Sequence, residues 1–224
     1  MIHYLLEVMC VKWKTIIFDM DGTLYDTEEI AKHAWYAIEK EFNLPVSDEF
    51  IISLCGRTRQ SAQEIFWNQF HGNWNEEETY RFRAKFMEQF KKENGPLPKM
   101  DLNKLFTALK AKGYRLAICS SSGREEILYN LSFDQLEGYF DVIVDGSMTK
   151  EGKPAPDIYL KTAELLQVEP KDCLVIEDSI SGCLSGLNAG MDVVMVIDLL
   201  QPTEELKERC YRILDRLEDL IDLV

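Results

Sequence analysis

The sequence predicts an α/β protein with a doubly wound parallel sheet and an inserted domain of four helices. Two observations predict the sheet: short runs of β-branched residues are apolar throughout, and helical patterns separate the later runs. Continuously apolar strands are typical of parallel sheets that helices cover on both faces. A third observation, a long aromatic-rich stretch without a strand signal, predicts the insertion. The 224 residues exceed the roughly 150 of an average domain, which leaves room for a second, smaller one.

Five runs are expected to form the strands. Each is rich in Val, Ile or Leu, and each is followed by polar or small residues that end the apolar pattern. Because helices separate the later runs, neighbouring strands are expected to pair in parallel through right-handed crossovers. The five runs are residues 15–18, 115–119, 142–144, 173–176 and 193–197.

Helical patterns fill the connections between the later strands. Asp101 begins one pattern, and Gly113 follows it in the position of a C-terminal glycine cap. Ser122 and Glu125 have the spacing of a capping box, which predicts a helix start there. Another pattern begins at Asp157. The last 20 residues repeat the amphipathic spacing and predict a final helix with apolar positions Leu206, Cys210, Ile213, Leu217 and Leu220.

The stretch from about residue 28 to residue 94 has helical periodicity and many aromatic residues, but no strand signal. Turn signals in FNLPVSDE, HGNWNEEE and ENGPLP divide it into about four helices. We therefore expect a helical cap domain at residues 28–95 and an α/β core made of residues 1–27 and 96–224.

Charge and composition exclude several classes of partner. The 25 basic and 39 acidic residues give a net charge of −14, without a basic tract, which disfavours nucleic acid and anionic membranes as partners. No apolar run approaches the roughly 20 residues of a membrane span. The six cysteines and three histidines have no metal-type spacing, so buried thiols in a reducing cytoplasm are expected. The oligomeric state is expected to be a monomer or a weak dimer.

Polar residues follow four of the predicted strands, and they form the candidate site. Ligands of open parallel sheets bind at the carboxyl ends of the strands, where these residues are expected to converge. Among them, Thr23 and Ser121 are predicted to contact substrate. The set comprises Asp19, Asp21, Gly22 and Thr23 after the first strand, Ser120, Ser121 and Ser122 after the second, Lys153 after the third, and Glu177 and Asp178 after the fourth.

These residue types favour metal-assisted phosphoryl transfer. Neighbouring carboxylates repel one another unless a hard cation such as Mg²⁺ joins them through oxygen ligands. A carboxylate can attack phosphorus, and a second one two residues on can donate and accept the proton. Lys153 and Mg²⁺ would neutralise charge on the transferring group, while Ser120 and backbone N–H groups would bind its oxygens.

The run IIFDMDGTLYDTE resembles the first motif of the haloacid dehalogenase superfamily, DxDGTLxDT/S. Ser120 in LAICSSS is similar to the second motif, Lys153 in GKPAPDIY to the third, and Glu177 and Asp178 in VIEDSISG to the fourth. The resemblance extends from about residue 14 to residue 197, with the motifs in the correct order. With its insert after the first motif, the chain is similar to the β-phosphoglucomutase-like subgroup with a helical cap.

The resemblance implies a role for each acid. Asp19 would be the nucleophile and Asp21 the general acid and base. Mg²⁺ would be bound by Asp19, the backbone carbonyl of Asp21 and Asp178, with Glu177 as a further ligand or a supporting residue. Simpler interpretations stay open: Ser120 as a helix cap, Lys153 as a solvated loop lysine, and Glu177 as a purely structural acid.

The type of reaction depends on a few positions. Asp21 favours phosphate-ester chemistry, because dehalogenases and phosphonoacetaldehyde hydrolases of the superfamily lack an acid there. In LCGRTRQSA, Gly56 and Arg59 match the GxxR pattern by which the family's sugar-phosphate mutases hold a second phosphate, and Arg57 is a neighbouring candidate. Arg59 is alternatively an exposed helix arginine. Ala31 stands where β-phosphoglucomutases carry a histidine, and His33 lies about 200° away around the helix.

The sequence thus predicts a Mg²⁺-dependent phosphatase for a small phosphorylated metabolite, with a sugar phosphate as the expected substrate class. A β-phosphoglucomutase-type mutase is the alternative. A non-catalytic domain that accepts a phosphoryl group in signalling is a remote one, because receiver domains are about half this length and lack both the helical insert and an acid placed like Asp21.

Overall fold

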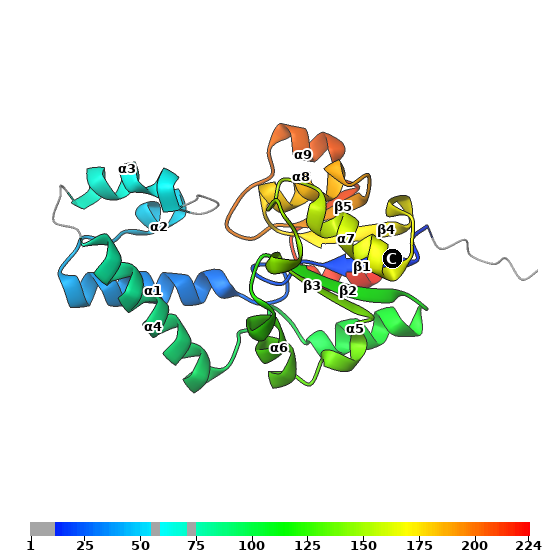
Figure 1. Ribbon diagram of the computed structural model, residues 1–224, viewed down its shortest axis with the longest axis horizontal. Helices are drawn as coiled ribbons and strands as arrows, with labels where there is room; N and C mark the ends of the chain where they lie inside the picture. Colours follow the sequence, from blue (N-terminus) through cyan, green and yellow to red (C-terminus); the bar gives the residue numbers. More distant parts are fainter. Residues whose placement is uncertain (1–11, 55–58, 71–74) are drawn as a thin grey trace, which may run out of the picture.

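The computed structural model describes residues 12–54, 59–70 and 75–224. At its centre, six parallel strands form one sheet in the order β3-β2-β1-β4-β5-β6 (Figure 1). The parallel α/β fold expected from the sequence is therefore confirmed. The strands are β1 (Thr15–Phe18), β2 (Arg115–Ser120), β3 (Val142–Asp145), β4 (Cys173–Glu177), β5 (Asp192–Val196) and β6 (Arg212–Leu214).

Helices cover both faces of the sheet, which explains why its strands are apolar throughout. Successive residues of β1 point to opposite faces: Ile16 and Phe18 pack into one hydrophobic cluster and Ile17 into another. The first cluster contains residues of α5 (Leu102–Ala111), α6 (Arg124–Phe133), η4 (Leu217–Asp219) and α10 (Leu220–Leu223). The second contains residues of α7 (Asp157–Leu166), α8 (Ile180–Asn188) and α9 (Glu204–Arg209).

Four helices between β1 and α5 form an insert on one side of the sheet (Figure 1). They have their own hydrophobic cluster, in which Trp35, Phe50, Phe66 and Phe70 make edge and tilted ring contacts. The helices are α1 (Thr27–Phe42), α2 (Asp48–Leu54), α3 (Arg59–Phe70) and α4 (Glu76–Asn94).

The two connections between the insert and the sheet lie side by side. The Asp26 N–H donates to the Leu97 carbonyl at 2.7 Å, and the Lys99 N–H donates to the Leu24 carbonyl at 2.9 Å. Tyr25 and Pro98 form an antiparallel bridge between them. The chain therefore leaves and re-enters the sheet layer through one paired junction.

The prediction of one helix over the last 20 residues is wrong. Only Glu204–Arg209 are helical before the chain turns and forms β6, which pairs in parallel with β5. The Tyr211 N–H donates to the Val193 carbonyl at 2.8 Å and begins this pairing. The unpaired edge of β5 offers backbone groups that β6 pairs with, so tertiary pairing overrides the helical spacing here.

The helix caps predicted from the sequence are confirmed at α5 and wrong at α6. The Asp101 carboxylate accepts from the Lys104 N–H at the start of α5, and Gly113 follows that helix with a φ of +89°. At α6, however, Gly123 is the N-cap and no side chain caps the helix, so the capping box expected from Ser122 and Glu125 does not form.

Three short 3₁₀ helices complete the connections around the later strands: η1 (Glu137–Tyr139), η2 (Gly146–Met148) and η3 (Pro170–Asp172). Within the part of the chain that the structure describes, no helix combines the length and the hydropathy needed to cross a bilayer.

The aromatic cluster of the insert is expected to stabilise the folded protein, and a substitution within it tests this. Phe66→Ala should lower the free energy of unfolding by about 3–5 kcal/mol, because Phe66 is only 2% exposed and its removal leaves a cavity. Trp67, the next residue of α3, is 69% exposed and is a matched control. Trp67→Ala should change stability by less than about 0.5 kcal/mol in urea denaturation followed by far-UV circular dichroism. Equal losses in both variants would contradict the assignment of the cluster.

Candidate active site

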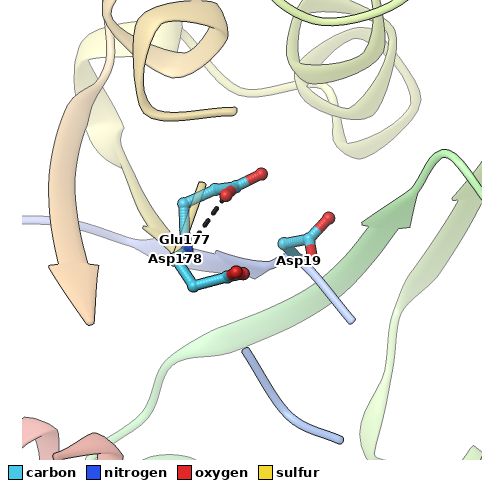
Figure 2. Close-up of side chains that lie close together, drawn as sticks. All are labelled: Asp19, Glu177 and Asp178. Atoms are coloured by element: carbon cyan, nitrogen blue, oxygen red, sulfur yellow. Dashed lines mark hydrogen bonds between the residues drawn. The ribbon is translucent and has the colours of Figure 1, made fainter. Parts of the chain in front are cut away.

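The strand order places the site at the point where the chain reverses direction across the sheet, between β1 and β4. Asp19 follows β1, while Glu177 ends β4 and Asp178 comes next. One carboxylate oxygen from each of these three acids, the acid cluster, lies within 4.8 Å of the other two (Figure 2). Asp19 is 5% exposed and Glu177 is 0% exposed.

The turn after β1 fits closely against Asp178. Gly22 has a φ of +84°, and a Cβ atom at this position would lie 2.3 Å from Asp178 Oδ2. Glycine is therefore required both for the backbone angle and for the space. The buried Thr23 hydroxyl donates to Asp178 Oδ1 at 2.7 Å. The turn thus orients one acid of the cluster without using Asp178 Oδ2.

Lys153 bridges two of the three acids. Its Nζ lies 2.5 Å from Asp19 Oδ1 and also contacts Glu177 Oε1, and its side chain is 9% exposed. Burial alone would lower the pKa of Lys153, but the neighbouring Asp19 and Glu177 carboxylates raise it well above its ordinary value. Lys153 is therefore a buried, charged ammonium, and the solvated loop lysine that the sequence left open is excluded.

The loop that carries Lys153 is fixed by α8. The Ser185 hydroxyl donates to the Ala155 carbonyl at 2.5 Å, and the Asn188 side-chain amide donates to the Pro154 carbonyl at 3.1 Å. Because both acceptors lie within two residues of Lys153, these bonds restrict where its side chain can begin.

Both carboxylate oxygens of Glu177 are occupied by donors. Oε2 accepts from the Asp178 N–H at 3.0 Å and from the Ser179 N–H and hydroxyl at 2.8 and 2.9 Å. Oε1 accepts from Lys153 and from the buried Tyr159 hydroxyl at 3.2 Å. Glu177 therefore holds Lys153 and the start of α8 in place, and it has little capacity left for a metal ion.

Unlike Glu177, Asp19 and Asp178 have carboxylate oxygens that are not occupied by hydrogen-bond donors of the described residues. Burial raises the pKa of Asp19 well above its usual range, and the other acids add to this effect while Lys153 opposes it. Burial and the charge of Glu177 raise the pKa of Asp178 to about 8. Oxygen donors that are buried and short of positive charge fit a hard divalent cation such as Mg²⁺.

The Asp21 carboxylate lies apart from the acid cluster. Its Oδ2 accepts from the Ser120 hydroxyl at 2.9 Å and from the Ser122 hydroxyl at 2.7 Å. Burial raises the pKa of Asp21, and these two hydroxyls partly offset the effect. The buried Ser120 also accepts from the Ser122 N–H at 3.0 Å, so its hydroxyl orients Asp21 instead of facing an open position. Ser121 is exposed at the strand end.

The residues expected to bind substrate from the insert are only partly described. Gly56 and Arg57 lie outside the described residues, and Arg59 begins α3 but its side chain is not described. On α1, Ala31 is buried. The His33 ring stacks on Phe90 of α4 at 5.5 Å, so His33 packs within the insert.

A small cavity of about 160 Å³ lies between the insert and the loop after β5. Its charged lining in the described residues is mostly acidic, with a single lysine. Burial and the neighbouring Asp198 raise the pKa of Glu28 in this lining. The lining residues that carry charge are Asp26, Glu28, Glu29, Lys32, Asp48 and Asp198.

Three functional contacts were not expected from the sequence: Ser122 with Asp21, and Tyr159 and Ser179 with Glu177. Ser179 also caps α8 by accepting from the Gly182 N–H, which is a local signal that the residues SISG carry. The contacts of Ser122 and Tyr159 join segments distant in sequence, and no local pattern marks them.

Comparisons with known proteins agree with this geometry. Residues 16–196 match the family model described as haloacid dehalogenase-like hydrolase. The chain is 28% identical over 214 residues to a phosphorylated carbohydrates phosphatase of Thermotoga maritima, covering 94% of this chain and 98% of the relative. It is 30% identical over 190 residues to the β-phosphoglucomutase of Bacillus subtilis, covering 82% and 83%.

The fold is shared with a solved haloacid dehalogenase hydrolase of Entamoeba histolytica. That structure is 26% identical in sequence, with a TM-score of 0.73 over 94% of this chain and 98% of the other. The likeness therefore extends over the sheet, its helices and the insert together.

The raised pKa of Asp178 predicts pH-dependent cation binding. Below about pH 8, Mg²⁺ must displace a proton from Asp178, so its affinity should rise with pH, by up to about tenfold per unit, and level off above pH 8. Isothermal titration calorimetry from about pH 6 to pH 9 measures this dependence. Asp178→Asn should weaken binding at every pH. An affinity independent of pH in the unaltered protein would contradict the assignment.

Proposed function

Because the chain belongs to the haloacid dehalogenase-like hydrolases, we propose that it is a Mg²⁺-dependent phosphatase that hydrolyses a small sugar phosphate through an aspartyl-phosphate intermediate. The observation that carries the proposal is the pairing of two differently held aspartates. Asp19 is fixed by Lys153 beside the acid cluster, while Asp21, two residues on, is held apart by two serine hydroxyls. One position suits a nucleophile, and the other suits a proton donor.

Asp19 is the proposed nucleophile. Its Oδ1 is held by Lys153, which fixes the carboxylate for attack on phosphorus. The Lys153 ammonium stays charged and lies beside the attacking group, so it would offset the negative charge that accumulates on the phosphoryl oxygens. Glu177 fixes the ammonium on its other side.

Asp21 is the proposed general acid and base. Burial raises its pKa, which favours a protonated carboxyl that can donate to the departing sugar oxygen. After that donation, the Asp21 carboxylate would accept a proton from the water that hydrolyses the aspartyl phosphate. The Ser120 and Ser122 hydroxyls, both bound to Oδ2, leave Oδ1 available for these transfers.

Asp19 and Asp178 are the proposed side-chain ligands of Mg²⁺, together with the backbone carbonyl of Asp21. The ion would supply positive charge that stabilises the phosphoryl oxygens in the transition state. Thr23 keeps Asp178 oriented through Oδ1, and Glu177 supports the site through Lys153. The insert is the proposed lid, which would close over the leaving group and exclude bulk water.

Two positions of α1 favour a phosphatase over a mutase. Ala31 offers no hydrogen bond to a sugar, and His33 is stacked against Phe90. The mutase is kept as the second candidate because the Bacillus subtilis β-phosphoglucomutase covers most of the chain.

Removal of the nucleophile tests the mechanism. Asp19→Asn should reduce phosphate release from sugar phosphates by more than about 1,000-fold, because an amide cannot form the covalent intermediate. The matched control is Asp215→Asn, an exposed acid of the C-terminal segment, which should stay within about twofold of the unaltered enzyme. Substantial residual turnover by folded Asp19→Asn protein would refute the assignment.

A single assay separates the two candidate reactions. The enzyme receives β-glucose 1-phosphate with a trace of glucose 1,6-bisphosphate, and both glucose 6-phosphate and inorganic phosphate are measured. Because Ala31 provides no hydrogen bond that would hold a sugar phosphate for a second transfer, inorganic phosphate should accumulate faster. Faster accumulation of glucose 6-phosphate would identify a mutase.

A further inference from the structure

Helix α6 contacts both the insert and the turn that follows β1. In its first turn, Glu126 forms an ion pair with Lys91 near the end of α4, and the Lys91 side chain is only 13% exposed. Three residues further along α6, the Tyr129 hydroxyl donates to the Lys91 backbone carbonyl at 2.9 Å. These two contacts, which we call the α4–α6 tie, join the insert to the core outside the paired junction (Figure 1).

Beside the tie, a cavity of about 450 Å³ separates α4 from α6. Both helices contribute to its lining, among them Ala84 and Met87 of α4 and Tyr129 of α6. Packed side chains therefore do not fill this stretch, and the tie bridges it. At the other end of α6, the Phe133 ring lies so close to Gly95 that a Cβ atom there would be 2.3 Å from Phe133 Cζ. Contacts near both ends of α6 thus fix it against the end of α4.

The same helix and the residues before it hold the turn that carries Asp21. Ser122, two residues before α6, donates to Asp21 Oδ2 at 2.7 Å. Within α6, the backbone carbonyl of the buried Asn130 accepts from the Tyr25 hydroxyl at 2.9 Å. The Asn130 side-chain amide lies 3.6 Å from the sulfur of Met20, which directly precedes Asp21. A displacement of α6 would therefore move the groups that orient Asp21.

We propose that Lys91 and Glu126 are positioning residues that couple the orientation of the insert to the general acid Asp21. The tie fixes the first turn of α6 when the insert lies over the leaving group. Ser122, four residues before Glu126, then keeps Asp21 directed at the leaving oxygen. The inference rests on the proposed phosphatase function, because it assigns the tie to the step in which the Asp21 proton passes to the sugar oxygen as the bond from that oxygen to phosphorus breaks.

Two leaving groups test this coupling. A sugar oxygen needs a proton as it departs, whereas p-nitrophenolate departs readily without one. Lys91→Met should therefore lower kcat/KM by roughly three- to tenfold for the best sugar phosphate, and by less than about twofold for p-nitrophenyl phosphate. A merely structural role would lower both values equally. Equal losses with the two substrates, or no loss with either, would overturn the proposal.

Further variants separate the tie from other effects of the substitution. Lys91→Arg keeps the ion pair and should stay within about twofold of the unaltered enzyme. The double variant Lys91→Met with Glu126→Met should lose no more than the stronger single variant, because both substitutions remove one contact. The matched control is Lys92→Met, which removes an exposed ion pair with Glu88 inside α4 and should leave activity unchanged. Losses that multiply in the double variant, or an equal loss in Lys92→Met, would contradict the tie.

Hydrogen–deuterium exchange tests the coupling without any activity. The Ile127 N–H donates to the Gly123 carbonyl at 3.1 Å in the first turn of α6. Lys91→Met should raise the exchange rate of the peptide covering this turn by about threefold or more, and Lys92→Met should not. Unchanged exchange in the Lys91→Met protein would overturn the tie whatever the activity. The expected exchange response, with no phosphate release by the unaltered protein from either substrate, would instead refute the phosphatase function.

Discussion

The clustering of three carboxylates, two of them buried and paired with one ammonium, is the constraint on which the rest of the site depends. Asp19, Glu177 and Asp178 bring up to three negative charges to a place that water hardly reaches, and Lys153 supplies one positive charge. Such a group is unfavourable unless other contacts distribute the charge. The three carboxylates differ in how many partners offset their charge. Both oxygens of Glu177 accept hydrogen bonds, one oxygen of Asp178 does, and Asp19 is paired with Lys153. The negative charge that remains unpaired favours the cation that the proposed mechanism requires.

The sheet topology follows from the same constraint. The acids come from β1 and β4, which are far apart in the chain but adjacent in the sheet, and the backbone bond from the Asp19 N–H to the Ile176 carbonyl at 3.0 Å joins their ends. Crossovers on both sides of this pair are needed to bring the Lys153 loop and the serines of β2 to the same edge. The strand order of this sheet therefore brings the polar side chains together at one edge. The apolar residues of the strands stabilise the sheet but do not position the site.

The central strands and the acids of the site could be predicted because their signals are local. Runs such as TIIF and CLVIE are apolar from end to end, and the polar residues that follow them have to lie at one edge of a parallel sheet. β6 could not be predicted, because its residues fit a helical period and only the free edge of β5 selects the strand. The capping role expected of Ser122 was wrong for a similar reason, because that pattern is local. Its place among the converging hydroxyls was expected, but its acceptor, Asp21, is 101 residues away in the chain and could not be identified.

The paired junction between the insert and the sheet has a consequence for how this enzyme class diversifies. Because Asp26 with Leu97 and Leu24 with Lys99 are joined by backbone hydrogen bonds, the ends of the insert are held together whatever helices lie between them. Side chains at the junction contribute nothing to these bonds, so the helices beyond it are free to drift in sequence. If the insert is the proposed lid, substrate preference can change on it while the proposed phosphoryl chemistry at the strand ends stays the same.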